Sequence, residues 1–373
     1  YELNISNLNI EGILDLKNFQ NIYRLDCSNN KITQILNLPK QLKYFDCSNN
    51  KIKTLIDFDF KEKKQFIDDC KYFNCKYNNL EELLYPFNIK PKKYPKNLKN
   101  LIFGFFFNCP IDNLPNTIKY LTFNFEFNQP VNNLPIDLTH LIFNNCSFNY
   151  SLDNLPIGLT DLTLIKGLFN QTLDNLPSGL INLVIYYNEF YYSVDNLPNN
   201  IVKLIINNSS FNQPIDNLPN SLEYILLSDN FNQPIDNLPN KLKWIKLFYS
   251  FNKSVNDLPN SLEYFILDDK SKFNQPVDNL PNNLIYLALG SDFNQPINNL
   301  PKNLKFLKLS CYFNHSIDKI PDSIIHLKIL NLYFNKFNKL PKFLETLTVN
   351  EYNNYDFIKI NPNIRINKIS YIC

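Results

Sequence analysis

The chain has 373 residues, of which 37 are Lys or Arg and 35 are Asp or Glu, so its formal net charge is only +2. This balance gives no sign of a surface built for nucleic acid or an anionic membrane, and we expect neither partner. The chain contains only six glycines. Phosphate-binding loops and oxyanion turns depend on glycine, so the composition argues against the common catalytic architectures.

The segments that direct a protein to a compartment are not evident. No apolar run approaches the roughly 18 residues of a membrane-spanning helix. Residues 1–16 are polar and acidic, and they lack the basic-then-apolar pattern of a secretory signal. Eight cysteines are too few for a disulfide scaffold of this length. We therefore expect a reducing, cytoplasmic-type location.

A first repeated frame lies within residues 1–96. The pattern Ile-x-x-Leu-x-Cys-x-x-Asn-x-Ile begins at Ile22, recurs with substitutions from Leu42, and returns more loosely from Phe73. Each copy is typical of a leucine-rich repeat. The charged stretch at about residues 57–69 is predicted to be an enlarged loop. The cysteine of each frame (Cys27, Cys47, Cys75) is expected to pack in the core, since no Cys-x-x-Cys pair suggests zinc.

A second frame repeats twelve times over residues 97–341. The tripeptide Asn-Leu-Pro, or a close variant, recurs every 20–22 residues, with its proline at 115, 135, 156, 177, 198, 219, 239, 259, 281, 301, 321 and 341. Each unit opens with Leu-x-x-Leu-x-Leu, as in Leu222–Leu227, which predicts one short strand. The unit is too short for an added long helix, and its prolines forbid one.

These patterns predict a mainly β solenoid of the leucine-rich-repeat type. We expect a curved array of about sixteen coils of 20–22 residues, with a parallel sheet on the concave face. Extended and turn-like return segments, with few or no helices, should form the convex side. Residues 342–373 should begin one more strand and form a C-terminal cap, so that the whole chain is one continuous solenoid.

The unit Phe-Asn-Gln-Pro-Ile/Val-Asp-Asn-Leu-Pro, seen at 211–219, 231–239 and 273–281, resembles the FNIP repeat. This relative of the leucine-rich repeat is abundant in social amoebae and in giant viruses of amoebae, and the resemblance covers about residues 98–341. It implies a location in the host cytoplasm or in a virion. In that family the array often follows an F-box, which implies the substrate-binding arm of a ubiquitin ligase. No F-box-sized helical module precedes the first repeat at Ile22.

The asparagine that follows the repeated phenylalanine is predicted to turn inward and to bond the backbone of the adjacent coil, because a buried corner needs hydrogen-bond partners. These asparagines form an expected structural ladder: Asn108, Asn128, Asn149, Asn170, Asn212, Asn232, Asn252, Asn274, Asn294 and Asn314.

Catalytic and metal chemistry find little support in the residues. His140 and His326 occupy equivalent positions nine coils apart, about 40 Å by strand spacing, so they cannot share a site. The aspartates of the Asp-Asn-Leu-Pro motif would stack along one edge. A cation ladder is conceivable there, but Asn replaces Asp at 132, 256 and 298, which favours turn capping. We expect no enzyme activity, metal or cofactor.

Binding is the better-supported function. The outward strand positions of the repeat place five aromatic residues in adjacent coils, beside a column of aliphatic residues and lysines. The expected protein-binding residues are Tyr224, Trp244, Tyr264, Tyr286, Phe306, Leu226, Ile266 and Lys246. Lateral stacking that only stabilises the sheet is the alternative. The leading prediction is a non-enzymatic protein-interaction scaffold. The second is a structural protein that assembles with copies of itself, as in a virion.

Overall fold

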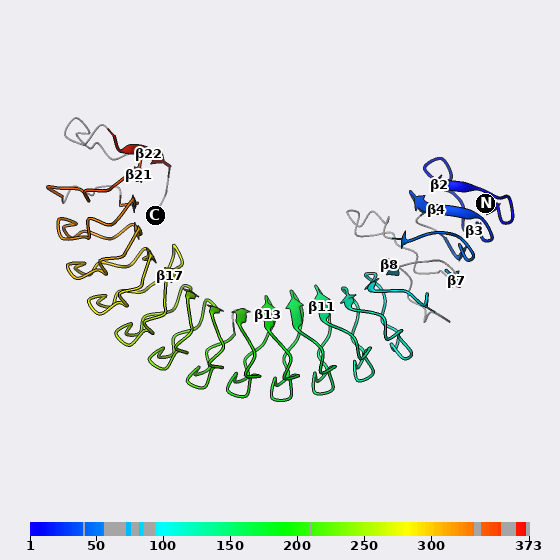
Figure 1. Ribbon diagram of the computed structural model, residues 1–373, viewed down its shortest axis with the longest axis horizontal. Helices are drawn as coiled ribbons and strands as arrows, with labels where there is room; N and C mark the ends of the chain where they lie inside the picture. Colours follow the sequence, from blue (N-terminus) through cyan, green and yellow to red (C-terminus); the bar gives the residue numbers. More distant parts are fainter. Residues whose placement is uncertain are drawn as a thin grey trace. The chain divides into compact units, whose positions relative to one another are not determined.

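The computed structural model describes residues 1–39, 42–55, 72–75, 82–85, 94–208, 210–331, 337–351 and 363–370. The chain divides into two compact units, Tyr1–Asn182 and Leu183–Cys373. Over the described residues it is a β-solenoid of about sixteen turns with parallel strands and no helix (Figure 1), which confirms the predicted fold. The predicted loop at residues 57–69 lies outside these residues.

The N-terminal turns carry two short strands each. One parallel sheet joins β1 (Glu2–Asn4), β3 (Arg24–Asp26), β5 (Tyr44–Asp46) and β7 (Tyr72–Asn74), while β2 (Glu11–Asp15) pairs with β4 (Lys31–Leu36). Residues before Ile22 therefore form a turn that the repeat frame did not predict. Its signal is present, because Leu3-x-Ile5-x-x-Leu8-x-Ile10 has the spacing of the later frames with Leu8 in place of asparagine.

The longer sheet continues from the second strand of these turns. Its first members are β6 (Thr54–Leu55), β8 (Glu82–Tyr85) and β9 (Asn100–Phe103), with Leu83 opposite Leu101. The frames that begin at Ile22, Leu42 and Phe73 run over β3, β5 and β7, which belong to the other sheet. The N-terminal turns alternate apolar residues twice, and either stretch fits the frame.

The remaining strands follow at one per turn. They are β10 (Tyr120–Phe123), β11 (His140–Asn144), β12 (Asp161–Ile165), β13 (Asn182–Tyr186), β14 (Lys203–Asn207), β15 (Tyr224–Leu227), β16 (Trp244–Leu247), β17 (Tyr264–Leu267), β18 (Tyr286–Ala288), β19 (Phe306–Leu309), β20 (His326–Ile329), β21 (Thr346–Asn350) and β22 (Arg365–Ile369). In the second unit the strands lie on the inner side of its arc, as Figure 1 shows. β22 pairs in register with β21, so residues 342–373 carry two paired strands where the sequence predicted one.

The core of the second unit is a continuous phenylalanine stack. Its seven rings are fully buried, and neighbouring ring centroids lie 5.9–6.3 Å apart. The members are Phe190, Phe211, Phe231, Phe251, Phe273, Phe293 and Phe313. The frame leucines of the strands close over this stack from the other side, because alternate strand residues point inward.

The asparagine ladder connects neighbouring turns at the surface. The side-chain oxygen of one asparagine accepts a hydrogen bond from the backbone N–H of the next, as between Asn232 and Asn252 at 2.9 Å. The same bond recurs at 2.8–3.2 Å through both units. The bond joins adjacent coils, and most of these bonds lie at residues that are exposed to solvent.

Candidate protein-binding face

The five predicted aromatic residues form one row on the inner sheet face of the second unit. We call Tyr224, Trp244, Tyr264, Tyr286 and Phe306 the aromatic strip. They are the first residues of β15 to β19 and lie opposite one another in the parallel register. The apolar residue that follows each ring in its strand, such as Ile225 after Tyr224, points into the core, so the rings point away from it.

The rings of the strip stack in two tight pairs. Tyr224 and Trp244 have centroids 4.0 Å apart with nearly parallel planes, and Tyr286 and Phe306 are 4.1 Å apart. Tyr264 lies between the pairs, 6.0 Å from Tyr286. Stacking of this kind stabilises a sheet on its own. Each ring is nevertheless only half-buried, so part of its apolar surface stays open to a ligand. The partial burial raises the pKa of Tyr224 and Tyr286.

A second column runs beside the strip, two residues further along each strand. We call it the lysine column. Its members are Leu226, Lys246, Ile266, Ala288, Lys308 and Lys328. Ala288 is 3% exposed and Lys308 is 8% exposed, while the other four are half-buried. The column therefore offers two patches, one around Lys246 and one at Lys328, separated by a closed stretch.

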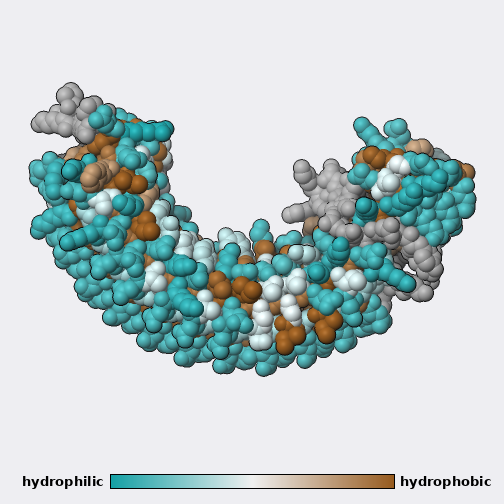
Figure 2. All heavy atoms as spheres, in the orientation of Figure 1, coloured by the Kyte–Doolittle hydropathy of each residue, from teal (hydrophilic) through white to brown (hydrophobic). Residues whose placement is uncertain are grey.

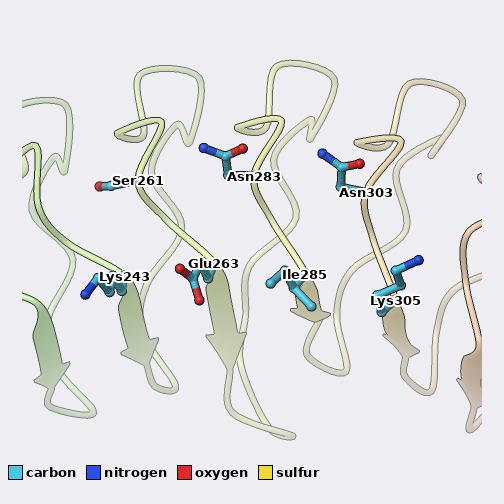
Figure 3. Close-up of a pocket in the computed structure, with 7 residues that line it drawn as sticks. All are labelled: Lys243, Ser261, Glu263, Asn283, Ile285, Asn303 and Lys305. Atoms are coloured by element: carbon cyan, nitrogen blue, oxygen red, sulfur yellow. The ribbon is translucent and has the colours of Figure 1, made fainter.

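An open groove of about 520 Å³ flanks the opposite edge of the strip. Figure 3 shows its lining, in which Lys243, Glu263, Ile285 and Lys305 each directly precede a strip residue in the sequence. Side chains from the segment just before each strand, such as Asn283 before β18, complete the wall of the groove. Charges of both signs alternate here with apolar and amide groups, so the groove is suited to a polar, mixed-charge segment and has no catalytic grouping.

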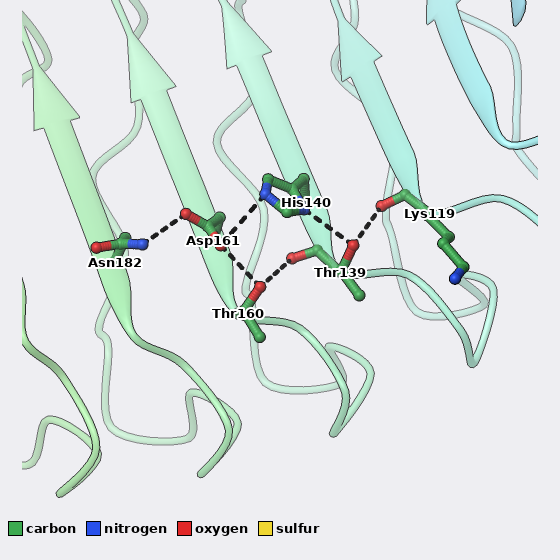
Figure 4. A network of polar contacts seen from close by, with 6 residues as sticks. All are labelled: Lys119, Thr139, His140, Thr160, Asp161 and Asn182. Atoms are coloured by element: carbon green, nitrogen blue, oxygen red, sulfur yellow. Dashed lines mark hydrogen bonds and ion pairs between the residues drawn. The ribbon is translucent and has the colours of Figure 1, made fainter.

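The equivalent positions of the first unit carry a polar network instead (Figure 4). His140 Nε2 lies 3.4 Å from the Asp161 carboxylate, and its Nδ1 is 2.9 Å from the Thr139 hydroxyl. Thr160 and Asn182 also donate to Asp161, each at 2.7 Å. The order hydroxyl, imidazole, carboxylate resembles a catalytic triad.

The network is better explained as structural. The Thr139 hydroxyl is also within hydrogen-bond distance, 3.0 Å, of the carbonyl oxygen of Lys119 on the neighbouring turn. The Thr160 hydroxyl makes the equivalent contact to the carbonyl oxygen of Thr139 at 3.1 Å. A repeated contact that ties each turn to the previous one satisfies backbone groups, and we assign it no catalytic role.

Four of the six described cysteines are buried thiols. Cys27, Cys47 and Cys75 are buried in the core of the first unit, and burial raises the pKa of each thiol, to about 12 for Cys75. Cys146 is also buried, with its Sγ 2.9 Å from a backbone carbonyl oxygen. Cys311 is disulfide-bonded, which the sequence did not predict.

The described residues contain no cluster of three or more His, Cys, Asp or Glu side chains that could hold a metal ion. Within the same ranges, no helix is long and apolar enough to cross a membrane.

The repeat motif is matched by a known family model. The model of the FNIP repeat matches residues 87–126, 211–250 and 273–312. The chain contains FNIP repeats. The chain resembles CroV588, a giant-virus protein whose structure is described as a circular leucine-rich-repeat protein, at 26% identity and a TM-score of 0.63. That likeness covers 90% of this chain and 59% of CroV588, so this FNIP-repeat chain spans less than two thirds of that protein.

More distant solved structures include YopM from Yersinia enterocolitica, at 20% identity and a TM-score of 0.49, covering 99% of this chain and 91% of YopM. The functional domain of InlJ from Listeria monocytogenes has 16% identity and a TM-score of 0.48, covering 94% of this chain and 74% of that one. No curated protein matches the FNIP-repeat chain in sequence.

Proposed function

We propose that this protein is a non-enzymatic scaffold that binds a protein partner on the aromatic strip. The supporting observation is a row of five large rings on a sheet face that polar residues could equally well occupy, as the His140 network does in the first unit. Aromatic rings held rigidly side by side are typical of the residues that contribute most to protein-protein binding. Repeat solenoids of this type commonly serve as interaction scaffolds.

The resemblance to FNIP-repeat proteins narrows this proposal. In that setting the scaffold would be the substrate-recognition arm of a ubiquitin ligase, with the strip contacting the substrate. We place it in a reducing compartment such as the cytoplasm, because the thiols of Cys27 and Cys146 form no disulfide. The disulfide of Cys311 is the observation against that location.

The test is substitution within the strip. Trp244→Ser and Tyr264→Ser should each abolish capture of a partner while the circular dichroism spectrum stays unchanged. Tyr312→Ser is the matched control, since this tyrosine is 61% exposed and lies outside the strip. Capture that survives both strip variants would refute the proposal.

A self-assembling structural protein is the second candidate. The observation that favours it is a set of exposed isoleucines in the first unit, with Ile136 64%, Ile157 72% and Ile181 39% exposed. Figure 2 shows hydrophobic atoms among the hydrophilic surface of the visible face. Light scattering coupled to size exclusion over a hundredfold concentration range separates the candidates. A 44.0 kDa species throughout favours the scaffold, and growth with concentration favours self-assembly.

A further inference from the structure

The charges beside the aromatic strip are not balanced. The lysine column holds three ammonium groups and no carboxylate, and Lys308 lies directly opposite Lys328 in the register. Like charges side by side on neighbouring strands destabilise a sheet unless something neutralises them. Which lysines have a counterion within the protein therefore indicates where a ligand could supply a negative charge.

Lys308 has its own counterion. Its ammonium group forms an ion pair with Asp269, which comes from two turns earlier and reaches across Ala288. Asp269 lies in the loop after β17, where the proline spacing lengthens to 22 residues. Ala288, the only alanine of the chain, lies between Ile266 and Lys308 in the register. The pair explains how Lys308 can be almost fully buried.

Lys328 has no such counterion. It is half-buried, and no carboxylate of the described residues lies within ion-pair distance of it. Its other neighbour in the register is Thr348, which is uncharged. Burial and the nearby Lys308 lower the pKa of Lys328, and Asp269 offsets this only in part. A half-buried ammonium held beside another cation gains most from an added anion.

Lys246, near the other end of the strip, also lacks a carboxylate partner among the described residues. It lies between Leu226 and Ile266 in the register, and its ammonium group sits 4.7 Å from the Phe248 ring centroid. Within the described ranges it too forms no ion pair. Four strand spacings of about 4.8 Å separate it from Lys328, which is about 19 Å. An extended peptide covers that distance in about six residues.

We propose that the occupant of the aromatic strip is an extended acidic segment of a partner protein, with two carboxylates about six residues apart that meet Lys246 and Lys328. Apolar side chains between the carboxylates pack on the rings. This proposal rests on the proposed scaffold function and names its partner's chemistry.

A continuous polyphosphate backbone fits less well, because charges of both signs flank the rings on the groove side. Glu223 and Lys243 form an ion pair there, and Glu263 also lines the groove, so the face offers no unbroken row of cations. Separate anionic groups suit this pattern better than a charge at every repeat of a nucleic-acid strand.

The experiment is selection of random linear 16-residue peptides displayed on phage against the whole chain. Wild type should enrich peptides with two acidic residues about six positions apart and apolar residues between them. The charge-reversed variant Lys246→Glu/Lys328→Glu should enrich Lys and Arg at the same positions. A peptide selected on wild type should bind Lys246→Gln/Lys328→Gln at least about tenfold more weakly, while Lys302→Gln, an exposed lysine outside the column, leaves binding unchanged.

The outcomes separate the two proposals. Apolar peptides that bind the double glutamine variant as tightly as wild type, but not Trp244→Ser, would overturn the acidic partner and leave the scaffold in place. No enrichment, or peptides that bind Trp244→Ser unchanged, would overturn both. Single-stranded oligothymidylate that binds more tightly than the selected peptides, and is lost in the lysine variant, would assign the face to nucleic acid and overturn the acidic segment.

Discussion

Removing one ring from the phenylalanine stack tests whether the stack carries the stability of the solenoid. Phe231 is fully buried, with Phe211 at 6.2 Å and Phe251 at 6.3 Å between ring centroids. Phe231→Ala should lower the free energy of unfolding by about 3–5 kcal/mol, since it leaves a cavity in a close-packed interior. The loss of two ring contacts favours the upper half of that range, at about 0.5–1.5 kcal/mol for each pair.

Urea denaturation followed by circular dichroism measures this loss, and hydrogen exchange locates it. Each turn contacts only its neighbours, so amide protection should fall first in the turn of Phe231 and in the two turns beside it. Two controls accompany this variant. Phe231→Leu fills most of the cavity but loses both ring contacts, so it should cost about 1–3 kcal/mol, and the exposed Tyr312→Ala should cost less than about 0.5 kcal/mol. A cost for Phe231→Ala no larger than that of Tyr312→Ala would refute the reasoning.

Three further changes test other contacts. Gly290→Ala would bring a new Cβ within 2.5 Å of the Ser271 Cβ, so it should cost about 1–3 kcal/mol in thermal denaturation, whereas Gly158→Ala, with its nearest neighbouring atom at 3.5 Å, should be close to neutral. Asn252→Ala removes the acceptor for the next turn's backbone N–H and should cost about 1 kcal/mol in urea, while the aspartate variant, which keeps an acceptor, should cost less. Backbone N–H donors lower the pKa of Asp318 from 3.8 to about 2, so its stabilising contribution is present above pH 3.8 and lost as the pH falls towards 2; Asp318→Asn should flatten the fall of the denaturation midpoint over that range.

The repeating part of the fold is readable from the sequence because its signals coincide at every turn. The Leu-x-x-Leu-x-Leu frame, the buried phenylalanine and the proline recur together, so each strand position is specified many times over. The N-terminal turns give a weaker prediction for the same reason. Each of these turns has two apolar stretches that fit the same frame, so the position of the strand is ambiguous. The first turn is harder to recognise because Leu8 stands where the later frames have asparagine.

The strip could be assigned to one sheet face from spacing alone, because strand residues alternate sides. The ion pairs of the lysine column beside it could not be predicted in this way. The bond between Asp269 and Lys308 joins residues 39 positions apart, and it depends on how a lengthened loop folds over the next turn. No periodic signal encodes that fold. The unmatched state of Lys328 follows only once the partner of Lys308 is known.

The phenylalanine stack bears on how such a chain changes over evolutionary time. Since neighbouring rings meet at nearly the same distance throughout the second unit, the contact between any two turns is almost interchangeable. Duplicating or deleting one whole turn in the gene would therefore join surfaces that already fit. The stretch from Asp269 through Ala288 and Gly290 to Lys308 is the exception, because its contacts span three consecutive turns. Those turns form a cassette that recombination can move only as a block.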